Sequence, residues 1–139
     1  MSTKNKIRVA VSGYFDPIHI GHIEYIKLAK KLGDKLVVIV NNDHQSKLKK
    51  GKSFMNESDR LEIVKSIIWV DDAIISIDKD GTVCKSIELV KPNIFANGGD
   101  RKNKEIPESI ICNKLGIKII DGLGKKIRSS SHYTGLKSK

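Results

Sequence analysis

The sequence predicts an α/β fold, a parallel sheet of about five strands flanked by helices, within one domain that spans residues 1–139. Short apolar runs rich in β-branched residues alternate with longer amphipathic segments, the order expected for right-handed β-α-β connections. The run 35–40 is apolar at nearly every position, which is typical of a parallel strand covered by helices on both faces. A length of 139 residues suits a single core, and the chain shows no internal repeat, linker or low-complexity segment.

Five apolar segments predict the strands, because each is short and dominated by aliphatic or β-branched residues. In chain order they are residues 7–12, 35–40, 73–77, 94–96 and 118–121. After the second strand, the sequence predicts a polar loop over residues 41–56 that contains Lys47, Lys49, Lys50 and Lys52.

The helices are predicted from apolar periodicity and from residues that start or stop a helix. Asn56 is a suitable N-cap for a helix that runs through residue 68, and Thr82 could cap a helix that runs to residue 90. Gly33 and Gly116 are suitable C-terminal stops. The remaining helices are expected at residues 23–32 and 107–115, and a short one is expected to open at residues 128–131.

The run Gly13-Tyr14-Phe15-Asp16-Pro17-Ile18-His19-Ile20-Gly21-His22 is the most informative part of the chain. It lies between the first strand and the first helix, so its two histidines fall at the start of that helix and on one face. A helix start offers backbone N–H groups and the positive end of the helix dipole, and imidazoles add side-chain donors. This combination predicts a phosphate site.

This run resembles the motif of the cytidylyltransferase-like nucleotidyltransferases, which join a nucleoside triphosphate to a phosphorylated acceptor and release pyrophosphate. The resemblance implies a Rossmann-like fold for nearly the whole chain. It also implies that His19 and His22 stabilise charge on the α-phosphate, and that Gly13, Tyr14, Phe15, Asp16 and Gly21 bind the nucleotide. From the residues alone, Phe15 could instead belong to the core, and Asp16 could hold the shape of the loop.

Other polar segments follow the second, fourth and fifth strands, and the carboxyl ends of parallel strands share one edge of a sheet. Lys50 or a neighbouring lysine is expected to neutralise phosphates. By resemblance, the loop after the fourth strand contacts the nucleotide, and the segment after the fifth strand holds the triphosphate. The residues expected in these two segments are Asn97, Gly98, Asp100 and Arg101, then Arg128, Ser129, Ser130 and Ser131.

We therefore expect a nucleotidyltransferase, with CTP and glycerol 3-phosphate as the leading substrate pair. The alternatives are adenylyl transfer from ATP to a sugar phosphate of the heptose-phosphate type, which Gly98-Gly99-Asp100 resembles, or to FMN. A non-catalytic nucleotide-binding sensor is the alternative from another class. Mg²⁺ is expected to accompany the triphosphate, no protein metal cage is expected, and the family resemblance implies a homodimer.

Composition narrows the function classes further. The net charge is +10, from 26 basic and 16 acidic residues, which suits anionic substrates. Only 5% of residues are aromatic and no nucleic-acid-binding motif is present, so we do not expect a nucleic-acid partner. No apolar run is long enough for a membrane span, and a cytoplasmic location is expected. Cys84 and Cys112 are expected to be buried free thiols in helices.

Overall fold

The computed structural model describes residues 6–98 and 107–123, and it confirms the predicted fold class. Five parallel strands form one sheet in the order β3-β2-β1-β4-β5. In this part of the chain the strands are β1 (Arg8–Gly13), β2 (Lys35–Val40), β3 (Asp72–Ile75), β4 (Ile94–Gly98) and β5 (Lys118–Leu123).

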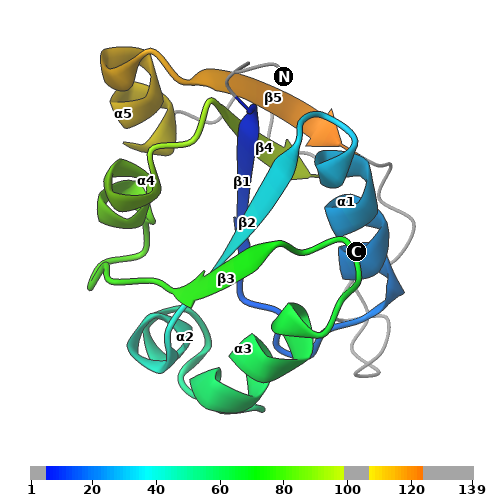
Figure 1. Ribbon diagram of the computed structural model, residues 1–139. Helices are drawn as coiled ribbons and strands as arrows, with labels where there is room; N and C mark the ends of the chain where they lie inside the picture. Colours follow the sequence, from blue (N-terminus) through cyan, green and yellow to red (C-terminus); the bar gives the residue numbers. More distant parts are fainter. Residues whose placement is uncertain (1–5, 99–106, 124–139) are drawn as a thin grey trace.

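The described helices lie on both faces of this sheet (Figure 1). They are α1 (Ile20–Lys30), α2 (Asp43–Lys50), α3 (Glu57–Lys65), α4 (Cys84–Val90) and α5 (Pro107–Leu115). Helices α1 and α3 cover one face, α4 and α5 cover the other, and α2 lies near the end of the sheet (Figure 1).

Alternation along the strands divides the core into two layers, as expected for a sheet buried on both faces. In β1, Val9 and Val11 face the layer that contains Ile26 of α1 and Val64 of α3. Ala10 between them faces the second layer, with Ile87 of α4 and Cys112 of α5. The central strand β1 is thereby fixed from both sides, and its carboxyl end is a rigid place for a site.

Helix α2 corrects the predicted loop over residues 41–56. Asn42 is its N-cap and accepts from the Gln45 N–H at 2.8 Å, while the Gln45 side chain accepts from the Asn42 N–H at 3.1 Å. This is a capping box, and Gly51 ends the helix with a left-handed φ of 88°. The predicted loop is wrong because the buried face of α2 is polar and is formed by Gln45 and Ser46. The segment therefore lacks the apolar periodicity from which a helix is predicted.

Several boundaries also differ from the predicted ones. Helix α1 begins at Ile20 and ends at Lys30, three residues before the predicted start and two before the predicted end. Helix α3 ends at Lys65 instead of residue 68, and β4 extends to Gly98. Strand β3 is shifted toward the N-terminus and β5 extends to Leu123.

Thr82 is not the N-cap of α4. That position belongs to Val83, whose side chain makes no capping hydrogen bond. The buried Asp78 carboxylate instead accepts from the N–H groups of Lys85 and Ser86 at 2.7 and 2.9 Å. A carboxylate six residues before the first residue of α4 therefore does the capping.

Both cysteines lie in helices as predicted, Cys112 buried and Cys84 half-buried, with no disulfide between them. Burial raises the pKa of the Cys112 thiol to about 11. Among the described residues, none of the helices combines the length and apolar character needed to cross a bilayer.

Candidate active site

The two histidines lie where β1 ends and α1 begins. His19 is the N-cap of α1 and has extended backbone angles, while His22 is in the first turn of the helix. Their rings face each other with centroids 4.1 Å apart. The structure therefore brings together the two residues that were predicted to contact the α-phosphate, at a helix start at the edge of the sheet.

Two backbone hydrogen bonds define the protonation of these rings. The Nδ1 atom of His19 accepts from the Gly21 N–H at 3.1 Å, and Nδ1 of His22 accepts from the His19 N–H at 3.1 Å. A ring nitrogen that accepts carries no proton, so each neutral ring carries its proton on Nε2. Nε2–H is the donor that each imidazole can offer to a phosphate oxygen.

His22 remains neutral at physiological pH. Burial of the ring, together with the neighbouring His19, lowers the pKa of His22 from 6.5 to about 4. Protonation at Nδ1 would also break the hydrogen bond from the His19 N–H. His22 is therefore suited to donate a hydrogen bond to a phosphate and is poorly suited to act as a cation.

The Phe15 ring packs against the His22 ring and supports it. Phe15 is 1% exposed, so the structure places it in the core, which was one of the two alternatives. Its ring meets the His22 ring edge to face, with centroids 4.9 Å apart. The backbone of Phe15 has a φ of 51°, a left-handed conformation that costs energy for an aromatic residue.

Gly13 is required by this turn. A Cβ atom at residue 13 would lie 2.9 Å from Cζ of Phe15. The glycine thus makes room for the aromatic ring that supports His22.

We expect Gly13→Ala to destabilise the protein by roughly 1–3 kcal/mol, because the added methyl group overpacks the Phe15 ring. Urea denaturation measures the change. Gly81→Ala is the matched control, since a Cβ at residue 81 meets nothing within 4 Å. Equal stability of the two variants would show that the Phe15 ring can move at no cost.

Asp16 fixes the motif to the segment that follows α2. Its buried carboxylate accepts from the N–H groups of Phe54 and Met55 at 3.0 and 2.8 Å. Lys50 pairs with the same carboxylate at 3.0 Å and also donates to the Asp16 carbonyl at 2.8 Å. Asp16 therefore holds the shape of the loop, and it brings the ammonium group of Lys50 beside the histidine motif.

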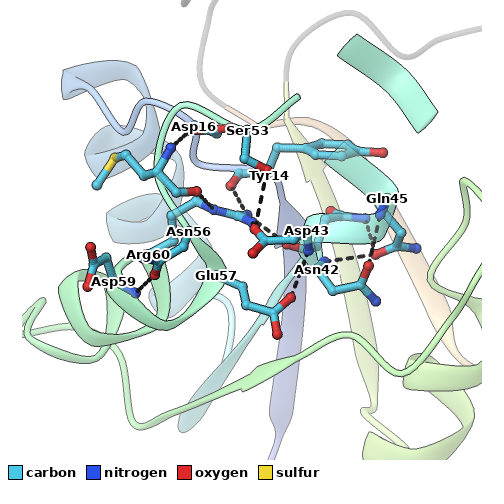
Figure 2. A network of polar contacts seen from close by, with 12 residues as sticks. Tyr14, Asp16, Asn42, Asp43, Gln45, Ser53, Asn56, Glu57, Asp59 and Arg60 are labelled. Atoms are coloured by element: carbon cyan, nitrogen blue, oxygen red, sulfur yellow. Dashed lines mark hydrogen bonds and ion pairs between the residues drawn. The ribbon is translucent and has the colours of Figure 1, made fainter. Parts of the chain in front are cut away.

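Arg60 of α3 connects this loop to the start of α2 (Figure 2). Its side chain is 1% exposed. It donates to the carbonyl groups of Met55, Tyr14 and Asn41 at 2.9, 2.7 and 2.6 Å, and to the Asp43 carboxylate at 2.7 Å. Partial burial acts to raise the pKa of Asp43. The hydrogen bond and charge of Arg60, with hydrogen bonds from the Glu57 backbone and Ser53, outweigh it and keep that pKa below its usual value.

Two further predicted site residues, Asn97 and Gly98, lie at the end of β4. Asn97 is buried and donates to Asp121 of β5 at 2.9 Å. A Cβ at Gly98 would lie 3.0 Å from the Tyr25 ring, whose hydroxyl donates to the Ala96 carbonyl at 2.6 Å. Helix α1 is thereby tied to the end of β4, next to β1.

The remaining predicted site residues lie outside the described part of the chain. They are Asp100, Arg101, Arg128, Ser129, Ser130 and Ser131. Of the other predicted residues, Tyr14 contributes its carbonyl to Arg60, and the ammonium group of Lys49 lies 4.5 Å from the Tyr14 ring centroid. Sequence reasoning missed Arg60, Asp43 and Tyr25, because a polar residue within a helix gives no local sign of hydrogen bonds to distant parts of the chain.

A family model described as cytidylyltransferase-like matches residues 10–131. This match covers most of the chain, including the histidine motif. The chain belongs to the cytidylyltransferase-like family. It is a nucleotidyltransferase, as the relatives described next also indicate.

Relatives of this family member include FAD synthases from archaea. The FAD synthase of Pyrococcus horikoshii is 44% identical over 103 residues, which cover 73% of this chain and 68% of the relative. That of Thermoplasma volcanium is 38% identical over 129 residues, 93% of this chain and 85% of the relative. A bifunctional protein HldE from Nitratiruptor is 37% identical over 120 residues, 85% of this chain but only 25% of the relative.

Solved structures agree with the fold. The crystal structure of the lipopolysaccharide core biosynthesis protein from Thermoplasma volcanium has a TM-score of 0.74 and 39% identity, covering 84% of this chain and 96% of that one. A protein from Archaeoglobus fulgidus has a TM-score of 0.61 at 20% identity, covering 83% of this chain and 88% of that one, and so supports the fold alone.

We expect Arg60→Lys to destabilise the nucleotidyltransferase by about 1–3 kcal/mol, because one ammonium group cannot reach all four acceptors that the guanidinium group serves. Urea denaturation measures the change. Arg8→Lys is the matched control, because Arg8 is exposed and donates to the Val90 carbonyl at the surface. A loss of less than 1 kcal/mol for Arg60→Lys would contradict the role assigned to the network.

The lowered pKa of His22 makes stability depend on pH. Between pH 6.5 and about 4 the unfolded chain binds more protons at this residue than the folded protein, so the free energy of unfolding falls as pH falls through this range. The loss approaches about 3 kcal/mol at the acid end. His22→Gln should remove this contribution, and His44→Gln, at an exposed position, should keep it. Urea denaturation at a series of pH values measures both, and identical pH profiles for the two variants would refute the assignment.

Proposed function

We propose that this protein is an FAD synthase that transfers the adenylyl group of ATP to FMN. The observation that carries the proposal is the similarity to archaeal FAD synthases at 38–44% identity, which in one case extends over 93% of the chain. These relatives favour the FMN alternative over the leading expectation of CTP and glycerol 3-phosphate.

In the proposed reaction, a phosphate oxygen of FMN attacks the α-phosphorus of ATP. A new P–O bond forms, the bond between the α-phosphorus and the bridging oxygen breaks, and pyrophosphate leaves with the electron pair. The phosphate of FMN is already ionised near pH 7, since its second pKa is about 6. The attacking group therefore requires no general base, and the site has only to align the phosphates and stabilise charge.

The described residues fit this task. His19 and His22 offer Nε2–H donors at the start of α1, where the helix dipole also favours negative charge. Lys50, held beside them by Asp16, supplies positive charge. Among the described residues, no group of three His, Cys, Asp or Glu side chains is arranged to hold a metal ion. We propose that Mg²⁺ arrives as part of the substrate, MgATP.

The test is product formation over a matrix of ATP and CTP against FMN, glycerol 3-phosphate and heptose 1-phosphate. Formation of FAD and pyrophosphate from ATP and FMN is the expected result. The sugar phosphate is included because of the HldE relative and the resemblance of Gly98-Gly99-Asp100. Turnover of CTP with glycerol 3-phosphate, without FAD formation, would overturn the proposal. The homodimer stays a prediction, which light scattering tests.

We expect His19→Ala and His22→Ala each to lower kcat for FAD formation by roughly 10²–10³, the loss typical of one preorganised donor to developing charge. Thermal unfolding of each variant controls for loss of the fold. Turnover close to that of the wild type in both variants would exclude the histidines from catalysis.

A further inference from the structure

The aromatic ring of Phe54 is a feature that the proposed chemistry leaves unused. Phe54 lies between α2 and α3 and is 61% exposed. Of the large hydrophobic side chains exposed in the described chain, it is the one aromatic residue. A single exposed apolar side chain needs no explanation by itself, because much of every protein surface is apolar. Phe54 differs from such a residue because its backbone is bound to Asp16 and two lysine side chains lie near its ring.

The backbone of Phe54 is held at the active site although its ring is exposed. Its N–H donates to the Asp16 carboxylate at 3.0 Å, and the next N–H, that of Met55, donates to the second oxygen at 2.8 Å. Asp16 is 4% exposed and lies three residues before His19. Two hydrogen bonds to a buried carboxylate leave this segment little freedom, so the ring stands on a fixed base beside the histidine motif.

Two ammonium groups lie near the Phe54 ring. Nζ of Lys50 is 5.2 Å from the ring centroid and Nζ of Lys52 is 5.9 Å from it. An exposed aromatic face flanked by cations suits a molecule that combines a flat heteroaromatic ring with negative charge, because the ring can stack while the ammonium groups attract the anion.

We propose that Phe54 determines acceptor specificity by stacking on the isoalloxazine ring of FMN. The inference rests on the proposed function, and names the residue that recognises its acceptor. It extends to Lys50 and Lys52, whose ammonium groups lie over the Phe54 ring and would attract the phosphate of FMN.

The sheet order favours the acceptor over the adenine of ATP as the stacked ring. Phe54 comes from the connection between β2 and β3, on one side of β1, while Asn97 and Gly98 end β4 on the other side. In phosphoryl transfer the attacking and leaving oxygens lie roughly in line across the phosphorus. The leaving oxygen belongs to pyrophosphate, so this geometry places FMN opposite pyrophosphate and leaves adenosine off the line. By the family resemblance the loop after β4 contacts the nucleotide, which leaves the β2 side of β1 to the acceptor.

The experiment compares steady-state kinetics of FAD formation by the wild type and Phe54→Ala. We expect the KM for FMN to rise roughly ten-fold, in line with the loss of one aromatic stacking partner, while the KM for ATP stays unchanged. Phe54→Tyr and Phe54→Trp should restore the KM for FMN, and Phe54→Leu, which keeps apolar bulk without a flat ring, should not. Ile68→Ala is the matched control, because Ile68 is 83% exposed and lies between α3 and the start of β3, at the opposite end of the sheet.

A binding measurement separates stacking from turnover. In Phe54→Trp, FMN added without ATP should lose flavin fluorescence on contact with the indole, to a greater extent than with the wild type. Normal FAD formation with an unchanged KM for FMN in Phe54→Ala would overturn the inference and leave the proposed function intact. A rise in the KM for ATP alone would overturn it too, by assigning the ring to adenine. Absence of FAD formation by the wild type would instead overturn the proposed function.

Discussion

The buried guanidinium of Arg60 is the interaction on which the rest of the site depends. It joins the turn after β1, the segment before α2 and the segment before α3, because it donates to a carbonyl group in each of these three pieces of chain (Figure 2). Arginine suits this place because its planar group presents several donors in fixed directions. The buried charge is tolerated because the Asp43 carboxylate balances it and the carbonyl groups satisfy its N–H donors.

The histidine pair is arranged by a second set of contacts that starts in the core. Gly13 leaves room for Phe15, the Phe15 ring meets His22, and the His22 ring faces His19. The backbone hydrogen bonds to Nδ1 then fix which nitrogen of each ring carries a proton. Catalysis by alignment requires donors that are in place before the substrate arrives, and this set of contacts provides it without a flexible side chain.

The sequence predicts the strands and the position of the two histidines, because each of these has a local pattern in the chain. Apolar runs predict all five strands, and the spacing of Gly13, His19 and His22 predicts a phosphate site at the start of α1. Helix α2 is not predicted, because its buried face consists of Gln45 and Ser46 and its exposed face is rich in lysine. Arg60 is not predicted either, because its burial depends on carbonyl groups supplied by residues as far as 46 positions away.

Acceptor recognition is also hard to predict from sequence, because the residue proposed for it belongs to no local pattern. The proposed role of the histidine motif depends on backbone geometry and spacing, whereas Phe54 is one aromatic residue in a short connection. Its importance becomes visible only when the structure shows that Asp16 holds its backbone and that Lys50 contacts both Asp16 and the Phe54 ring. The hydrogen bonds to Asp16 fix the backbone position of residue 54. They do not involve its side chain, so the type of side chain at this position can change without loss of these bonds. If Phe54 contacts the acceptor as proposed, substitution at residue 54 would alter the preferred acceptor and leave the contacts at the start of α1 in place.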